Sequence, residues 1–98
     1  MYAYTPATDL HANDEAYLLT VDLPGVSEAD IDLTVEGRVL TLRAGGGEDS
    51  ATRWYRRFNL PRAIAVEDIS AQHAAGVLQL RIPRTTPPTR RIPIAHAP

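Results

Sequence analysis

The residues that most often carry out chemistry in proteins are few in this chain, and they are not arranged for it. Its three histidines, His11, His73 and His96, are scattered and lack the spacing of zinc ligands. The chain has no cysteine, and none of its serines lies in a Gly-x-Ser-x-Gly nucleophile elbow. Gly45 to Gly47 are not followed by the Lys-Ser/Thr pair and helix of a phosphate loop. The sequence therefore predicts no enzyme, no metal site and no cofactor.

The informative pattern is apolar and lies near the end of the chain. Ile92, Pro93 and Ile94 follow a stretch, residues 84–91, that has no apolar side chain to pack. Pro93 favours extended backbone at itself and at Ile92, so the two isoleucines project to the same side. Burying both would contribute roughly 3–6 kcal/mol before ordering costs. This pattern predicts a plug for a groove, in the same domain or in a neighbouring one, although a plain tail is the simpler alternative.

Composition narrows the class of protein further. With 98 residues the chain has room for one domain. A net charge of −2 gives no basic field that would recruit nucleic acid or an anionic membrane. The absence of cysteine fits a reducing compartment, and the first residues show no secretory signal, so we expect a cytoplasmic protein. No apolar run is long enough to span a bilayer.

The rest of the chain, which would have to supply the groove for such a plug, consists mainly of short runs typical of β-strands. Apolar residues alternate with polar ones in runs that end at Gly, Pro or Asp, which predicts an all-β sandwich or barrel. Strands are predicted over residues 17–22, 31–36, 39–43, 53–60, 69–73 and 77–82. Gly37 and Arg38 suit a type II′ hairpin turn, and Ser27 is placed to cap a short helical turn at 28–30. In the last strand, Leu78 and Leu80 are expected to face inward.

One strand combines aromatic and basic residues. Such a strand could bind nucleic acid by stacking, but Trp54 and Phe58 share a face and are more simply interpreted as core. Arg56 lies on the same apolar face, so it needs a partner, and we expect a carboxylate at an interface.

Four motifs in order resemble one family. They are Leu-Pro-Gly-Val at 23–26, Trp-Tyr-Arg-Arg-Phe-Asn-Leu-Pro at 54–61, Ala71 followed by Gly-Val-Leu at 76–78, and Ile-Pro-Ile at 92–94. Together they resemble the α-crystallin domain of small heat-shock proteins. The resemblance implies an immunoglobulin-like antiparallel β-sandwich with a short arm at 1–7, an α-crystallin domain at 8–83 and a C-terminal extension at 84–98. It also implies an ATP-independent holdase that binds unfolding client proteins and self-associates.

The resemblance also implies where the plug docks. In the family the C-terminal motif binds between two strands near the sheet edge, which here correspond to residues 31–36 and 69–73. The groove candidates are Ile31, Leu33, Val35, Ile69, Ala71 and His73. Parity within the strands does not decide which of them face the groove and which face the core.

The segment between the predicted strands at 39–43 and 53–60 departs from the family pattern. The segment that usually swaps into a dimer partner is reduced to about eight residues, too few for a strand and its reach. We therefore expect any dimer to use the strand that carries Arg56 and Arg57. The alternative function is a sandwich of the CS-domain type, a co-chaperone adaptor, against which the Ile-Pro-Ile motif argues.

Overall fold

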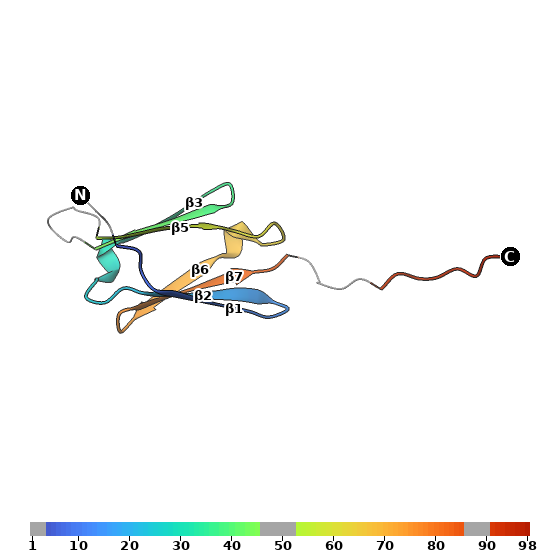
Figure 1. The fold of residues 1–98 in the computed structure, drawn as a ribbon, viewed down its shortest axis with the longest axis horizontal. Coiled ribbons are helices and arrows are strands. Elements are labelled where there is room, and N and C mark those ends of the chain that lie inside the picture. Colours follow the sequence, from blue (N-terminus) through green and yellow to red (C-terminus); the bar gives the residue numbers. More distant parts are fainter. Residues whose placement is uncertain (1–3, 46–52, 86–90) are drawn as a thin grey trace.

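The chain folds into a sandwich of two antiparallel sheets. The computed structural model describes residues 4–45, 53–85 and 91–98. Its strands are β1 (Thr8–Ala12), β2 (Ala16–Asp22), β3 (Ile31–Glu36), β4 (Val39–Ala44), β5 (Trp54–Asn59), β6 (Ser70–Ala74) and β7 (Val77–Pro83). Two short 3-10 turns, η1 (Glu28–Asp30) and η3 (Val66–Asp68), lie between strands. Figure 1 shows the sandwich with residues 91–98 running away from it as an extended tail.

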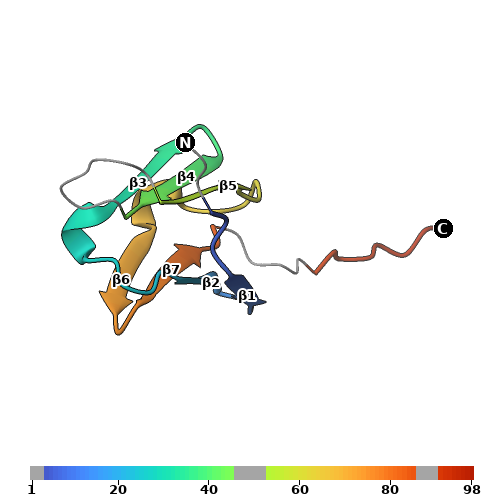
Figure 2. The same ribbon diagram turned by 60° about the vertical axis from the view of Figure 1, so that its left-hand side comes forward.

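Each sheet has a simple strand order. One sheet has the order β1-β2-β7-β6 and the other has the order β3-β4-β5, with all named pairs antiparallel. Figure 2 shows the two sheets as separate layers. The predicted all-β sandwich is therefore confirmed, and β3, β5, β1 and β6 are its edge strands.

The hairpin turns follow from where the backbone needs a positive φ. Gly37, with φ of 60°, is the first of the two residues between β3 and β4, as the predicted type II′ turn requires. Between β6 and β7 both turn residues are left-handed, with φ of 51° at Ala75 and 77° at Gly76, which is the pattern of a type I′ turn. Among the described residues, Ala75 is the one non-glycine residue with a positive φ.

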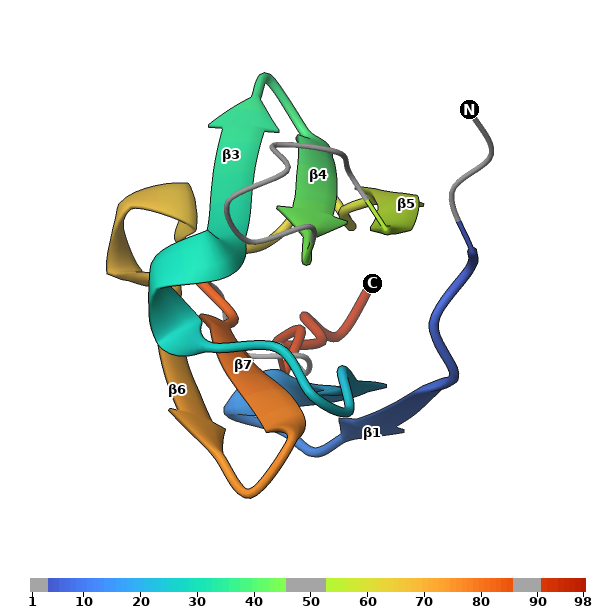
Figure 3. The ribbon, with the colours of Figure 1, turned by 90° about the vertical axis from the view of Figure 1, so that its left-hand side faces the viewer.

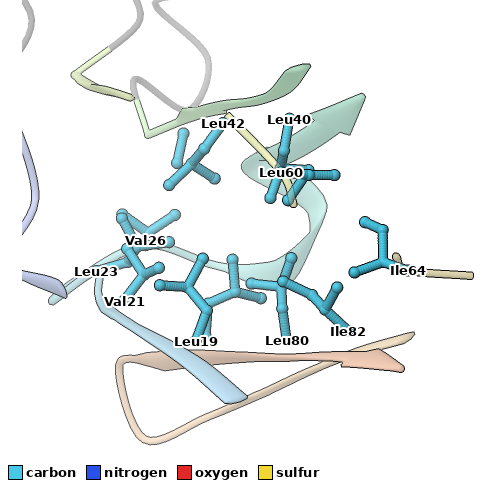
Figure 4. Close-up of a cluster of buried hydrophobic side chains, with 12 residues drawn as sticks. Leu19, Val21, Leu23, Val26, Leu40, Leu42, Leu60, Ile64, Leu80 and Ile82 are labelled. Atoms are coloured by element: carbon cyan, nitrogen blue, oxygen red, sulfur yellow. The ribbon is translucent and has the colours of Figure 1, made fainter. Parts of the chain in front are cut away.

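The core lies between the sheets and is built by the alternating faces of the central strands. Its buried members are Leu19, Val21, Leu23, Val26, Leu40, Leu42, Ala44, Leu60, Ile64, Leu78, Leu80 and Ile82. Figure 4 shows leucines of β4 facing those of β2 and β7 across the layer. Leu78, Leu80 and Ile82 are at most 3% exposed, whereas their neighbours Val77 and Gln79 are exposed, so the predicted parity of β7 is confirmed.

The two open sides of the sandwich are closed differently. On the β5 and β1 side, residues 4–7 cross from one sheet to the other: Tyr4 N–H donates to Arg53 O (2.7 Å), and Asp22 N–H donates to Ala7 O (2.9 Å). Pro6 in this N-terminal crossover is fully buried. Figure 3 shows the crossover running from the level of β5 down to β1, while η1 lies on the opposite side, between β3 and β6.

Some local predictions need correction. β1 was not predicted, because Thr8–Ala12 contains a single large apolar residue and so shows no alternation. The strand predicted at 69–73 runs from Ser70 to Ala74. Ser27 does occupy the N-cap position of η1, but its hydroxyl donates to Asp30 Oδ2 (2.9 Å) rather than accepting a backbone N–H.

Candidate functional site

An apolar pocket lies between the edge strands β3 and β6. Its volume is about 200 Å³, and it is lined by Leu33, Val35, Leu40, Val66, Ile69, Ser70, Ala71 and Leu80. Leu33 and Val35 are on the inward face of β3, since each pairs with a buried leucine of β4. Because these half-buried side chains lie at an edge, one flank of each stays open to a ligand from outside the sandwich.

The structure separates the six predicted groove residues into two groups. Leu33, Val35, Ile69 and Ala71 are brought together around the pocket. Ile31 is half-buried but sits at the other end of β3, opposite Ala44. His73 is likewise outside the pocket, opposite Leu78 near the end of β6, and its half-buried ring has a buried Nε2 atom without a hydrogen-bond partner.

Four lining residues were not among the predicted ones. Leu40 and Leu80 form part of the buried core and also line the pocket. Val66 comes from η3, where no strand alternation marks it, and Ser70 precedes Ala71 on β6. The inward parity of the central strands could have indicated the two leucines, whereas the position of Val66 depends on the path of the connection from β5 to β6.

The tail carries its two isoleucines in the open. Ile92 is 73% exposed and Ile94 is 95% exposed. Both belong to an extended segment that leaves the sandwich, as Figure 1 shows. The apolar pocket and the apolar knobs therefore occur on the same chain without touching each other.

The point where the chain leaves the sandwich is fixed on two flanks. Arg84 N–H donates to Glu15 O (2.8 Å), and Thr85 N–H donates to Ala63 O (3.2 Å). The Arg84 guanidinium lies over the ring of Tyr17, 4.5 Å from its centroid, and donates to the Tyr17 hydroxyl (2.9 Å). Because Ala65 N–H donates to the carbonyl of Pro83 (2.9 Å), this anchor lies beside η3 and the pocket.

Arg56 finds its partners within its own chain. It was expected to need a carboxylate at an interface, but its guanidinium donates to Thr8 Oγ1 (2.7 Å) and Pro6 O (3.4 Å) and lies 5.0 Å from the Phe58 ring centroid. These contacts join β5 to the start of β1. Arg57 is exposed on the opposite face of β5. A role for either arginine in a dimer stays a prediction.

The comparison with known proteins accounts for this geometry. The sequence profile of the Hsp20/alpha crystallin family matches residues 9–95. The chain belongs to the Hsp20/alpha crystallin family. This family consists of ATP-independent chaperones rather than enzymes. The match includes both the strands that form the pocket and the Ile-Pro-Ile tail.

Individual relatives of this Hsp20-family chain are moderately similar. Small heat shock protein C2 of Rickettsia felis is 32% identical over 92 residues, covering 81% of this chain and 60% of the relative. Spore protein SP21 of Stigmatella aurantiaca is 31% identical over 95 residues, covering 84% of this chain and 56% of the relative. The chain therefore spans less than two thirds of the length of these relatives.

Solved structures show the same fold. A small heat-shock protein from Xylella fastidiosa has a TM-score of 0.74 at 26% identity, covering 97% of this chain and all of that one. Heat shock protein 16.0 from Schizosaccharomyces pombe has a TM-score of 0.74 at 19% identity, covering 96% and 99% of the two chains. Within residues 4–45, 53–85 and 91–98 of this family member, no helix is long and apolar enough to cross a membrane.

Proposed function

We propose that this chain is an ATP-independent holdase that binds unfolding client proteins and assembles through its Ile-Pro-Ile tail. The observation that carries the proposal is the coexistence of two apolar features, the pocket between β3 and β6 and the exposed isoleucines of the tail. Neither the pocket nor the two isoleucines is covered by another of the described residues, so both would bury apolar surface if a partner bound there. A tail from one subunit that fills the pocket of another would join subunits into assemblies.

The shape of the two partners supports this docking. Extended backbone at Ile92 to Ile94 projects both side chains to one side. The pocket is flanked by two strand edges, so an extended segment can lie along it with its side chains directed inward. Arg84 and Thr85 are bound to the sandwich, so six residues, 86–91, separate the anchor from the motif and can extend ~20–22 Å, which permits a neighbouring subunit to be reached. Division into an arm at 1–7, a domain at 8–83 and an extension at 84–98 stays part of this proposal.

The same apolar surfaces are proposed to capture clients. Exposed strand edges and apolar grooves bind extended, partly unfolded chains, because such chains offer the same main-chain groups and apolar side chains. Reversible release of the tail would expose the pocket. A holdase of this kind needs no nucleotide and no catalytic group.

The proposed activity is tested by light scattering of a thermally unfolding client. Client aggregation should fall in proportion to added chain up to about equimolar amounts, and adding ATP should leave the suppression unchanged. An inert protein of similar mass serves as the control. Undiminished scattering in a several-fold molar excess of the chain would refute the holdase proposal. Binding of one chaperone by a strictly monomeric chain would instead favour the adaptor alternative.

The cytoplasmic location predicted from composition also stays a proposal. Similar proteins include a 23.6 kDa heat shock protein of Arabidopsis thaliana that is named as mitochondrial. Fractionation of cells that produce the protein with its natural ends tests the location directly.

A further inference from the structure

The strand β1 forms a free edge of its sheet. Among the described residues β1 pairs with β2 alone, and Asp9 to Ala12 are all exposed. Leu10 is 58% exposed although it is a large apolar residue on the face of the sheet that looks toward the sandwich interior, opposite the buried Leu19. An exposed edge strand has unpaired N–H and C=O groups that can form hydrogen bonds with a strand of another chain.

The hydrogen bonds to β2 determine which groups of β1 point outward. Asp22 N–H donates to Ala7 O, and Asn13 N–H donates to Ala16 O (3.0 Å). In an antiparallel ladder hydrogen-bonded residues alternate, so Asp9 and His11 also direct their N–H and C=O groups to β2. Thr8, Leu10 and Ala12 therefore direct theirs to the free edge.

We propose that this edge pairs antiparallel with the same edge of a second copy, with the twofold axis at Leu10. In this register Leu10 faces Leu10 of the second copy as a hydrogen-bonded pair, and Thr8 faces Ala12. The interface is isologous, since each strand supplies the same residues to it. It joins the four-stranded sheets of two copies into one continuous sheet.

The side chains complement each other in this register. Asp9 of one copy lies opposite His11 of the other, and both are about 70% exposed on the outer face. They form a non-hydrogen-bonded pair, in which opposing Cα atoms are only ~4.5 Å apart, so their side chains meet closely. Within one copy Asp9 Oδ2 lies 2.9 Å from His11 Nε2, and in the pairing each group would exchange this partner for the same group of the other copy. On the inner face the two exposed Leu10 side chains cover one another.

Arg56 helps to define this edge. Its hydrogen bonds to Thr8 Oγ1 and Pro6 O hold the chain where β1 begins. The inferred pairing uses neither the pocket nor the tail, so it can hold or fail independently of Ile-Pro-Ile docking.

Disulfide trapping tests the register, because the chain contains no cysteine. Leu10→Cys places one thiol opposite its own copy at a Cα separation of ~5.5 Å, within the range that a disulfide spans. Ala12→Cys is the matched control on the same exposed strand. Its two copies would be four residues out of register, ~13 Å apart. Mild oxidation should produce covalent dimer at least about tenfold faster from Leu10→Cys than from Ala12→Cys.

Non-covalent variants provide a second test that does not depend on thiols. Leu10→Pro removes an N–H that points to the free edge and costs no bond to β2, so it should abolish the association while Leu10→Ala only weakens it. Asp9→Arg should weaken association, and adding His11→Asp should restore it. The trapping result should be the same when Ile92 and Ile94 are both changed to Gly. Equal trapping of the two cysteine variants, or faster trapping of Ala12→Cys, would overturn the proposal.

Discussion

The double substitution Ile92→Gly and Ile94→Gly removes both knobs of the proposed plug. Both side chains are exposed and neither belongs to the core cluster, so the sandwich should keep its circular dichroism spectrum. We expect assemblies to become smaller, because the tails can no longer fill the pockets of neighbouring subunits.

The magnitude follows from how much surface the isoleucines expose. Fully burying an isoleucine contributes about 1.5–3 kcal/mol, and Ile92 and Ile94 are 73% and 95% exposed, so both together contribute about 2.5–5 kcal/mol per docked tail. The tail backbone must become ordered on docking in both the wild type and the double variant, and glycine makes this ordering less favourable. The substitution should therefore weaken each tail contact at least about fiftyfold.

The assay is sedimentation velocity over a wide range of protein concentrations. The concentration at which assemblies reach half their maximum should rise by that factor in the double variant. Ala95→Gly with Ala97→Gly is the matched control, since it makes the tail equally flexible without touching the motif. A free peptide carrying Ile-Pro-Ile should bind the Ile92→Gly, Ile94→Gly variant more tightly than wild type, whose pockets are already filled.

The pocket side of the contact can be blocked separately. Ala71 lines the pocket, whereas Gln72 is exposed on the other face of the same strand. Ala71→Trp should mimic the loss of the tail, and Gln72→Trp should behave as wild type. Unchanged assembly size and unchanged peptide affinity in both Ile92→Gly, Ile94→Gly and Ala71→Trp would show that the tail does not dock in this pocket.

Three further predictions concern the sandwich itself. Leu80→Ala should lower the free energy of unfolding in urea by about 2–5 kcal/mol, and Gln79→Ala on the outer face should change it little; equal effects would contradict the strand parity. Ala75→Asn should raise stability by about 0.5–1 kcal/mol, because asparagine tolerates the left-handed turn better, and a loss would argue against a type I′ turn. Arg56→Ala should lower stability by about 1–3 kcal/mol, and Thr8→Val added to it should cost little more, since both remove the same hydrogen bond; fully additive losses would separate the two.

The strands that the sequence predicts are those whose burial alternates. β7 is predicted with its faces because Leu78, Leu80 and Ile82 are buried between exposed neighbours. β1 escapes prediction because its formation depends on pairing with β2 and on Arg56, which lies 48 residues from Thr8. A local pattern carries no information about such a contact.

The pocket was predictable only in part for the same reason. The family resemblance indicated the two strands that flank the pocket, but alternation in β3 did not separate Leu33 and Val35, which line it, from Ile31, which does not. Val66 lines the pocket because the connection from β5 turns there into η3. Arg56 shows the converse case: its need for a partner could be inferred from its apolar face, but the partner is a nearby hydroxyl and carbonyl rather than a carboxylate.

The position of β7 within its sheet determines how the domain responds to a pulling force. The tail continues directly from β7, which is an interior strand flanked by β2 and β6. Tension on a docked tail therefore acts along the strand axis and loads the hydrogen bonds to both neighbours together, in shear. An edge strand pulled sideways would instead be peeled off one bond at a time. Arg84 and Thr85, bound to Glu15 and Ala63, spread the load to flanking segments before it reaches β7. If tails tether subunits as proposed, each sandwich should stay folded when a bound client pulls the subunits apart.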